Sequence, residues 1–341
     1  MTDVFKSLFI NTNSILNIHP STDIPVGTQN TKQEHTMQTI TFPNRNGQGI
    51  IMAADIHTPS GFNAGQRYPA IVIAHPGGGV KEQAAGLYAA KLAEHGYVAI
   101  AFDASYQGAS SGEPRQLENP YIRTEDVSAV IDHLTTLPYV DADRIAAMGV
   151  CAGGGYAANA AINDRRIKAL ATVSAVNIGA MFRNGWDGNT PSADAMGLLQ
   201  YGAQARSNDA SAQAMTIPLA PMRKEDAPNA ELAEAWEYYH TPRCQHPNAP
   251  GFTYARNLTQ LVTYDAFNFA EIYLTQPVLT VVGSEAGSKW MSDDLIHRAA
   301  STDKTQHVVE GGNHMSFYDV PHYVDAAIAQ LVPFFDAKLA G

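Results

Sequence analysis

The feature that most limits the fold of this 341-residue chain is a series of short apolar runs, each followed by a helix-forming segment. Residues 70–75 (AIVIAH), 97–103 (YVAIAFD) and 144–150 (RIAAMGV) have the length and composition of strands that are covered on both faces. Helix-forming segments at 83–95 and 124–137 separate them. Because strands joined through helices run parallel, the pattern predicts a doubly wound, mostly parallel α/β sheet.

The alternation continues toward the C-terminus with one interruption. A helix from residue 152 and a strand at 168–175 extend it, and a strand at 277–283 resumes it. Between them, residues 177–270 are rich in Asn, Pro, Met, Trp and Tyr and contain helical stretches such as NAELAEAWEYYH. We therefore predict a cap inserted between strands of one core. The predicted parts are an N-terminal arm (1–36), a core (37–176 and 271–341) that opens with an antiparallel hairpin, and the cap (177–270).

Composition excludes several classes of protein. Hydrophobic residues make up 45% of the chain and charged residues 16%, which suits a globular protein with a well-buried core. The 22 basic and 33 acidic side chains give a formal net charge of -11, which argues against nucleic acid or an anionic membrane as a partner. The two cysteines, Cys151 and Cys244, form no disulfide framework, and no signal peptide or apolar membrane-spanning run is visible. We expect a cytoplasmic protein, and the sequence leaves open whether it forms a homo-oligomer.

The sharpest local signal is a G-x-C-x-G motif at residues 149–153, between a predicted strand and a predicted helix. Small residues on both sides of Cys151 suit a tight turn that presents a nucleophile at the start of a helix. The helix N-terminus and a histidine partner would lower the pKa of the thiol. We therefore predict Cys151 to be the nucleophile.

A literal G-x-S-x-G motif also occurs, centred on Ser110. It follows the strand that ends at residue 103 and runs into a polar loop rich in Gly and Pro, with no helix behind the serine. The expected nucleophile turn leads directly from a strand into a helix. We therefore interpret the segment around Ser110 as a loop that lines the mouth of the site.

Two further segments supply the expected partners of the thiol. HPGGG at residues 75–79 ends the first parallel strand, where backbone amides of Gly77 and Gly78, together with that of Ala152, would form an oxyanion hole. The segment EGGNHMS places His314 after the last strand, as the chain order nucleophile, acid, histidine requires. We predict His314 to be the general base.

The acid is the least defined member of the predicted triad. It should follow the strand at 277–283, where Glu285 is the only carboxylate in the turn, and Asp265 and Asp293 are the alternatives. A cysteine depends on such an acid less than a serine does, because a thiolate forms an ion pair with histidine alone. The triad is therefore predicted as Cys151, His314 and Glu285, with the third position open to those alternatives.

Other signals indicate no cofactor. His240, Cys244 and His246 are close in sequence, but a fourth ligand with metal spacing is missing, so we predict no metal site. The aromatic residues of the cap are predicted to pack within the cap first and to form a wall for the substrate second.

Over about residues 37–339 the chain resembles the dienelactone hydrolase-like branch of the α/β-hydrolase superfamily, through HPGGGVKEQ, FDASYQG, GVCAGGG and GGNHMS. It is similar in particular to bacterial hydrolases and to fungal polyketide-transferase or thiohydrolase-like proteins. The resemblance implies the α/β-hydrolase fold, Cys151 as nucleophile, His314 as base and the three oxyanion donors named above. Two positions depart from the pattern: such proteins often carry an aspartate at or beside Gly287, and dienelactone hydrolase itself has a glutamate where this chain has Pro76.

These expectations lead to one main hypothesis and three alternatives. The main hypothesis is a cofactor-free hydrolase that acts on ester, thioester or lactone bonds of a small molecule through a covalent acyl-enzyme. Acyl transfer at the same site is the first alternative. A non-catalytic small-molecule receptor and a cysteine peptidase are the others, and the large cap disfavours the extended groove that a peptidase needs.

Overall fold

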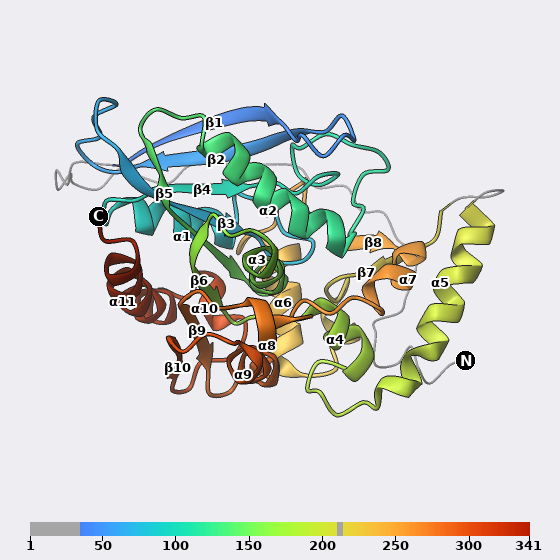
Figure 1. The fold of residues 1–341 in the computed structure, drawn as a ribbon. Coiled ribbons are helices and arrows are strands. Elements are labelled where there is room, and N and C mark those ends of the chain that lie inside the picture. Colours follow the sequence, from blue (N-terminus) through green and yellow to red (C-terminus); the bar gives the residue numbers. More distant parts are fainter. Residues whose placement is uncertain (1–34, 210–213) are drawn as a thin grey trace.

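The computed structural model describes residues 35–209 and 214–341, which are built around an eight-stranded sheet (Figure 1). The strands are β1 (Thr36–Pro43), β2 (Ile51–Thr58), β3 (Tyr68–Ala74), β4 (Val98–Phe102), β5 (Val140–Val150), β6 (Ile167–Val173), β9 (Val278–Gly283) and β10 (Lys304–Val309). Their order across the sheet is β1-β2-β4-β3-β5-β6-β9-β10. β1, β2 and β4 pair antiparallel, and all pairs from β4 to β10 are parallel. The predicted fold class is confirmed, including the antiparallel hairpin at one edge.

Helices cover both faces of the sheet. They are α1 (Ala84–Ala93), α2 (Pro120–Leu134), α3 (Ala152–Asn163), α8 (Ala270–Tyr273), α9 (Lys289–Arg298), α10 (Ser316–Asp319) and α11 (Pro321–Lys338). Apolar residues of α1 and α11 share one buried cluster with one face of the sheet, and those of α2, α3 and α9 share another with the opposite face. The strands between the two clusters are apolar on both sides, which is why they appear as continuous apolar runs in the sequence.

The segment between β6 and α8 lies outside these two layers (Figure 1). It contains α4 (Ile178–Asn184), α5 (Met196–Asp209), α6 (Ala230–His240), α7 (Leu258–Leu261), the small antiparallel pair β7 (Thr216–Pro218) and β8 (Phe252–Tyr254), and 3-10 turns at Ser192–Ala195, Lys224–Asp226 and Ala255–Asn257. Residues of α6 join the same buried cluster as α1 and α11, so α6 connects this segment to the sheet. The predicted arm at residues 1–36 lies outside the described residues except for its last two.

One helix begins earlier than the sequence pattern indicated. The Asn119 side chain accepts hydrogen bonds from the backbone N–H groups of Tyr121 (3.0 Å) and Ile122 (3.4 Å), and Pro120 occupies the first helical position. Both features favour a helix start, so α2 begins at Pro120 rather than at residue 124. The missed signal was the N-cap, because the apolar periodicity becomes clear only later in the helix.

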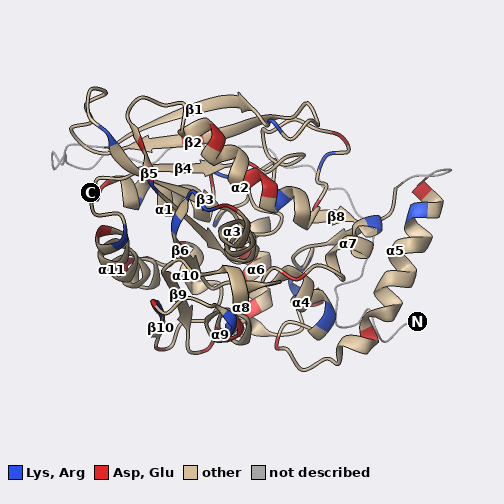
Figure 2. Cartoon of the chain, viewed as in Figure 1, with Lys and Arg blue, Asp and Glu red and all other residues tan. Residues whose placement is uncertain are grey.

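Charged residues of both signs are interspersed on the outer helices (Figure 2). On α9, Lys289 pairs with Asp293 at 2.7 Å, and on α11, Lys338 pairs with Asp303 at 2.6 Å. Such exposed pairs add little to stability. Within the described residues, no helix is both long enough and apolar enough to cross a membrane.

Candidate active site

Cys151 occupies the turn between β5 and α3 in a strained backbone conformation. Its φ of 57° and ψ of -128° are unusual for any residue other than glycine. The turn is held on both sides, since Cys151 N–H donates to Val173 O (3.1 Å) and Cys151 O accepts from Gly154 and Val176 (2.9 Å each). Strain of this kind persists only where the surroundings enforce it, and it is concentrated at functional sites.

Two glycines beside Cys151 are required by close packing. A Cβ on Gly153 would lie 2.1 Å from Ala74 O, and one on Gly149 would lie 2.1 Å from the carbonyl carbon of Gly153. Neither position has room for a side chain. The small residues of the predicted elbow therefore let α3 begin directly against the end of β3.

The thiol of Cys151 has three hydrogen-bonding neighbours: the backbone amides of Gly77 and Ala152 and the hydroxyl of Tyr318. The structure thus brings two of the three predicted oxyanion donors, the amides of Gly77 and Ala152, to the Cys151 sulfur. The third, Gly78, has a φ of 70°, and a Cβ built on it would lie 3.1 Å from Leu219 of the inserted segment.

Burial raises the pKa of the Cys151 thiol above its ordinary value of 9.0, although the Tyr318 hydroxyl and the amides of Ala152 and Gly77 act in the opposite direction. The sequence led us to expect a lowered pKa from the helix N-terminus. That expectation is wrong, because burial of the thiol outweighs the nearby dipoles even though Cys151 is only partly shielded from solvent. Cys151, the predicted nucleophile, is therefore a neutral thiol at physiological pH.

His314 is 1% exposed and is held through both ring nitrogens. Its Nδ1 lies 2.6 Å from Ser288 Oγ, and its Nε2 lies 3.2 Å from the Tyr318 hydroxyl. Burial lowers the pKa of His314 to about 3, so the imidazole is neutral at physiological pH. A neutral imidazole can accept a proton at one of its two nitrogens only, so the hydrogen-bond partners of the ring decide which nitrogen this is.

The predicted acid Glu285 is not the partner of His314. Its side chain is exposed, while its backbone N–H donates to Gly312 O at 2.9 Å. The turn after β9 continues past Glu285 and directs Ser288, at the start of α9, toward the imidazole. A serine hydroxyl therefore stands where the sequence predicted a carboxylate.

The two alternative acids also lie elsewhere. Asp265 accepts a hydrogen bond from Asn177 (2.7 Å) and pairs with Arg298 (3.0 Å). Asp293 pairs with Lys289 and accepts from Gln306 at 2.9 Å. Both carboxylates are thus engaged in contacts around α9, and neither serves His314.

A carboxylate from the inserted segment contacts the backbone around His314 rather than its imidazole. Glu231 of α6 accepts from the backbone N–H of His314 (2.5 Å), from the N–H of Gly287 (3.2 Å) and from the Trp186 indole (2.6 Å). The Trp186 ring lies edge-on to the His314 ring, with centroids 4.7 Å apart. Glu231 therefore braces the loop through its backbone and leaves the imidazole nitrogens to Ser288 and Tyr318.

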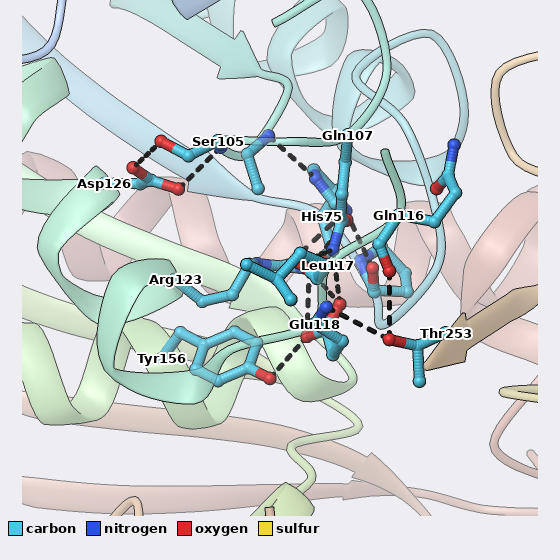
Figure 3. Close-up of polar contacts among 12 residues, drawn as sticks. His75, Ser105, Gln107, Gln116, Leu117, Glu118, Arg123, Asp126, Tyr156 and Thr253 are labelled. Atoms are coloured by element: carbon cyan, nitrogen blue, oxygen red, sulfur yellow. Dashed lines mark hydrogen bonds and ion pairs between the residues drawn. The ribbon is translucent and has the colours of Figure 1, made fainter. Parts of the chain in front are cut away.

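A buried polar network contacts the loop that follows β3 at His75 and Pro76 (Figure 3). Arg123, which is 2% exposed, donates to His75 O at 2.7 Å and pairs with Glu118 at 3.1 Å. Glu118 also accepts from Tyr156 (2.5 Å) and Gln107 (2.6 Å). Each charge in this network is therefore paired and hydrogen-bonded, as a buried ion pair requires.

His75 belongs to the same support and is not a second base. Its Nδ1 donates to Pro76 O at 2.7 Å, and its Nε2 accepts from the N–H of Ala104 at 3.2 Å. Burial, reinforced by the charge of Arg123, holds the pKa of His75 well below 6.5. A neutral ring with both nitrogens occupied by backbone groups fixes the loop that carries Gly77.

The remaining sequence signals have structural roles. Ser110 is 1% exposed, donates to Asp103 O (2.6 Å) and accepts from Ala53 N–H (2.9 Å), so its hydroxyl is fully engaged. No three or more His, Cys, Asp or Glu side chains in the described part of the chain are grouped to hold a metal ion. The structure instead adds Ser288, Tyr318 and Glu231, none of which the sequence pattern had indicated.

The family follows from comparison with known proteins. The sequence model of the X-Pro dipeptidyl-peptidase (S15) family matches residues 48–315. The chain belongs to this family. Among known proteins, the chain is similar to the uncharacterized protein YcjY of Escherichia coli K12, with 62% identity over 301 residues, or 88% of this chain and 98% of YcjY.

Solved structures agree with the S15 assignment at the level of the fold. The crystal structure of the hypothetical protein PA2218 from Pseudomonas aeruginosa is 30% identical, with a TM-score of 0.82 over 95% of this chain and 99% of PA2218. The α/β-hydrolase GrgF from a Penicillium species has a TM-score of 0.74 at 18% identity over 90% of this chain and all of GrgF, and is also named a polyketide transferase. The S15 chain therefore has the α/β-hydrolase fold, and its family and fold are those of hydrolases of ester or amide bonds.

Proposed function

We propose that the chain hydrolyses the ester, thioester or lactone bond of a small, uncharged molecule through an acyl-enzyme on Cys151. The observation that carries this proposal is the surroundings of the thiol. A cysteine in a strained turn has two amides at its sulfur and is connected to a buried histidine. Those are the groups that acyl transfer needs: a nucleophile, donors for the oxyanion and a base.

The mechanism starts from a neutral thiol and a neutral imidazole. With Nδ1–H donated to Ser288 Oγ, the Nε2 of His314 is free to accept a proton. The thiol then loses its proton as sulfur attacks the carbonyl, and the amides of Gly77 and Ala152 stabilise the oxyanion. As the carbonyl re-forms, His314 gives up the proton it gained and the leaving group departs protonated, and in the second half-reaction His314 serves as the base for water.

The cavity at Cys151 indicates the substrate class. Its volume is about 60 Å³, and its walls are largely apolar. They include Val176, Ile178, Met181, Leu219, Leu232 and Met315. No Lys, Arg, Asp or Glu is among the described residues that line it. A short, neutral acyl group fits such a cavity, whereas the free ammonium of an X-Pro dipeptide would enter without a carboxylate to pair with it.

Acyl transfer is the second candidate. GrgF, which shares the fold, is named a polyketide transferase, and 32% identity to it extends over 114 residues, or 33% of this chain. The largely apolar walls of the cavity support this candidate as well, because they limit the contact of an acyl-enzyme with water while another alcohol or thiol binds. Product analysis with and without an added small alcohol separates transfer from hydrolysis.

The test compares three probes: p-nitrophenyl acetate, S-acetyl-N-acetylcysteamine and Ala-Pro-p-nitroanilide. We expect turnover of the first two, with an acetyl adduct on Cys151 detected by mass spectrometry, and loss of both adduct and turnover in Cys151→Ala. The matched control is Cys244→Ala, which removes the second cysteine and should turn over both probes at the wild-type rate. Binding without turnover would instead support a receptor, and preferential cleavage of the dipeptide anilide would support a peptidase.

A further inference from the structure

Tyr318 stands between the two groups that must exchange a proton. It lies in α10, four residues after His314, and is 2% exposed. Its hydroxyl is 3.2 Å from His314 Nε2 and forms a hydrogen bond with the Cys151 thiol. The hydrogen-bonded path from sulfur to imidazole therefore passes through this hydroxyl.

The tyrosine is held in place from several directions. Its ring packs edge-on against those of Tyr238 and Tyr239, with centroids 5.0 and 6.4 Å away, and its N–H donates to Met315 O at 3.1 Å. The Tyr239 side chain also forms a hydrogen bond with Tyr318. Such packing leaves the ring few alternative positions, so the hydroxyl is oriented before the substrate arrives.

We propose that Tyr318 is a catalytic residue that relays the proton between Cys151 and His314. The proposal rests on the proposed function, because the relay serves the acylation of Cys151. A phenol hydroxyl can do this because it donates one proton and accepts another at the same oxygen.

The relay conserves protons and electron pairs at each step. As sulfur bonds to the substrate carbonyl, the S–H bond breaks and its proton moves to the Tyr318 oxygen, while the original Tyr318 proton moves to His314 Nε2. The products are the tetrahedral oxyanion, a neutral tyrosine and imidazolium. When the carbonyl re-forms, the leaving group departs with the Tyr318 proton, and imidazolium returns its proton to Tyr318.

Burial explains why the two transfers occur together. It raises the pKa of Tyr318 well above 10, and the nearby Cys151 and Tyr239 raise it further, so a free phenolate is a costly intermediate. The low pKa of His314 likewise disfavours an isolated imidazolium before the attack begins. A concerted transfer avoids both charged species in the resting site.

The test uses Tyr318→Phe, which keeps the ring and removes the hydroxyl. We expect acetylation of Cys151 by p-nitrophenyl acetate to slow by about 100-fold, the contribution typical of a positioned acid–base group. Rates in mixtures of light and heavy water give a second readout. The wild type should show the curved dependence of two protons in motion, and Tyr318→Phe the linear dependence of one.

The matched control is Tyr88→Phe. Tyr88 is also buried, and its hydroxyl donates to Phe317 O at 3.0 Å, one residue before Tyr318. This variant should lose some stability but keep the wild-type rate and curvature. Should Tyr318→Phe fail to fold, 3,5-difluorotyrosine at position 318 preserves the shape and makes the phenol more acidic, and it should change the acetylation rate where the same replacement at Tyr88 does not.

The outcomes separate the relay from the proposed function. If Cys151→Ala is inert while Tyr318→Phe reacts within a factor of two of wild type with its curvature unchanged, the relay is wrong and the acyl-enzyme stands. If wild-type Cys151 takes up no acetyl group, the proposed function fails and the relay fails with it. Slow acetylation and a linear dependence in Tyr318→Phe, with Tyr88→Phe unaffected, support both.

Discussion

Replacing Ser288 by aspartate tests whether the absence of a carboxylate at His314 Nδ1 sets the resting state of the site. In the structure, Ser288 Oγ lies 2.6 Å from this nitrogen, and the pKa of His314 is lowered to about 3 by burial. A carboxylate in the same place favours the protonated imidazole, so Ser288→Asp should raise this pKa. The thiol should then ionise more readily, because its proton has a better acceptor.

The size of the effect follows from the separation of the charges. A carboxylate and an imidazolium about 4 Å apart attract each other by roughly 4 kcal/mol at an effective dielectric constant near 20, which corresponds to about 3 pKa units. The pKa of His314 should therefore rise from about 3 to about 6. Ser288 is fully buried, so the new carboxylate should also cost about 1–3 kcal/mol of unfolding free energy.

Two measurements follow the change: NMR titration of His314 and the pH dependence of Cys151 alkylation by iodoacetamide. In the wild type, alkylation should increase up to pH values above 9, because the pKa of the thiol is raised. In Ser288→Asp it should become substantial at lower pH. Ser288→Asn is the control, because asparagine has the same size as aspartate but no charge. It should leave both titrations at their wild-type positions.

The reasoning would be refuted if the aspartate and asparagine variants gave the same His314 titration midpoint. That result would mean that the side chain at position 288 turns away from the imidazole once enlarged. A shift in both variants would instead point to an altered burial of the ring, and it would remove the electrostatic explanation.

Three further results are expected. Glu285→Gln should change kcat/KM by no more than about twofold, as for an exposed side chain, and a tenfold loss in steady-state kinetics would return Glu285 to the triad. Gly287→Asp should lower the unfolding free energy by about 2 kcal/mol or more in urea denaturation, because its Cβ would lie 2.6 Å from Trp186 Nε1 and 2.8 Å from Glu231 Oε2; unchanged stability would contradict this packing. Between pH 6.5 and about 3 the unfolded protein binds a proton at His314 that the folded protein does not, so the unfolding free energy decreases as the pH is lowered through this range. His314→Gln removes this proton and should reduce that decrease by about 1.4 kcal/mol per pH unit. Parallel denaturation profiles for the two proteins across this range would argue against the lowered pKa of His314.

The sheet and the nucleophile turn were predictable because both impose strong local constraints on sequence. The central stretches of β3 and β5, residues 70–74 and 145–150, are buried on both faces and must be apolar. At Gly149 and Gly153, contacts of 2.1 Å exclude any side chain, so the small residues around Cys151 are visible as a motif. The position of His314 after β10, the last strand, was predictable from the chain order of this fold, and its role as the base stays a prediction.

The partners of His314 were not predictable in this way. A serine three residues after Glu285 resembles any loop hydroxyl, and only the path of the turn after β9 directs Ser288 to the ring. Tyr318 lies in a helix of four residues, which is too short to show periodicity. Glu231 is 83 residues from His314 along the chain, and their contact depends on how α6 docks on the sheet.

The three hydrogen bonds that Glu231 accepts limit how this site can be re-engineered. Grafting the loops after β9 and β10 into another α/β-hydrolase without α6 would leave the N–H groups of His314 and Gly287 without their acceptor. Replacing the inserted segment with that of another hydrolase, to widen the substrate range, would also remove Glu231 and leave the same N–H groups without an acceptor. In this protein the loop that carries His314 and the inserted segment that carries Glu231 can therefore be transplanted only together.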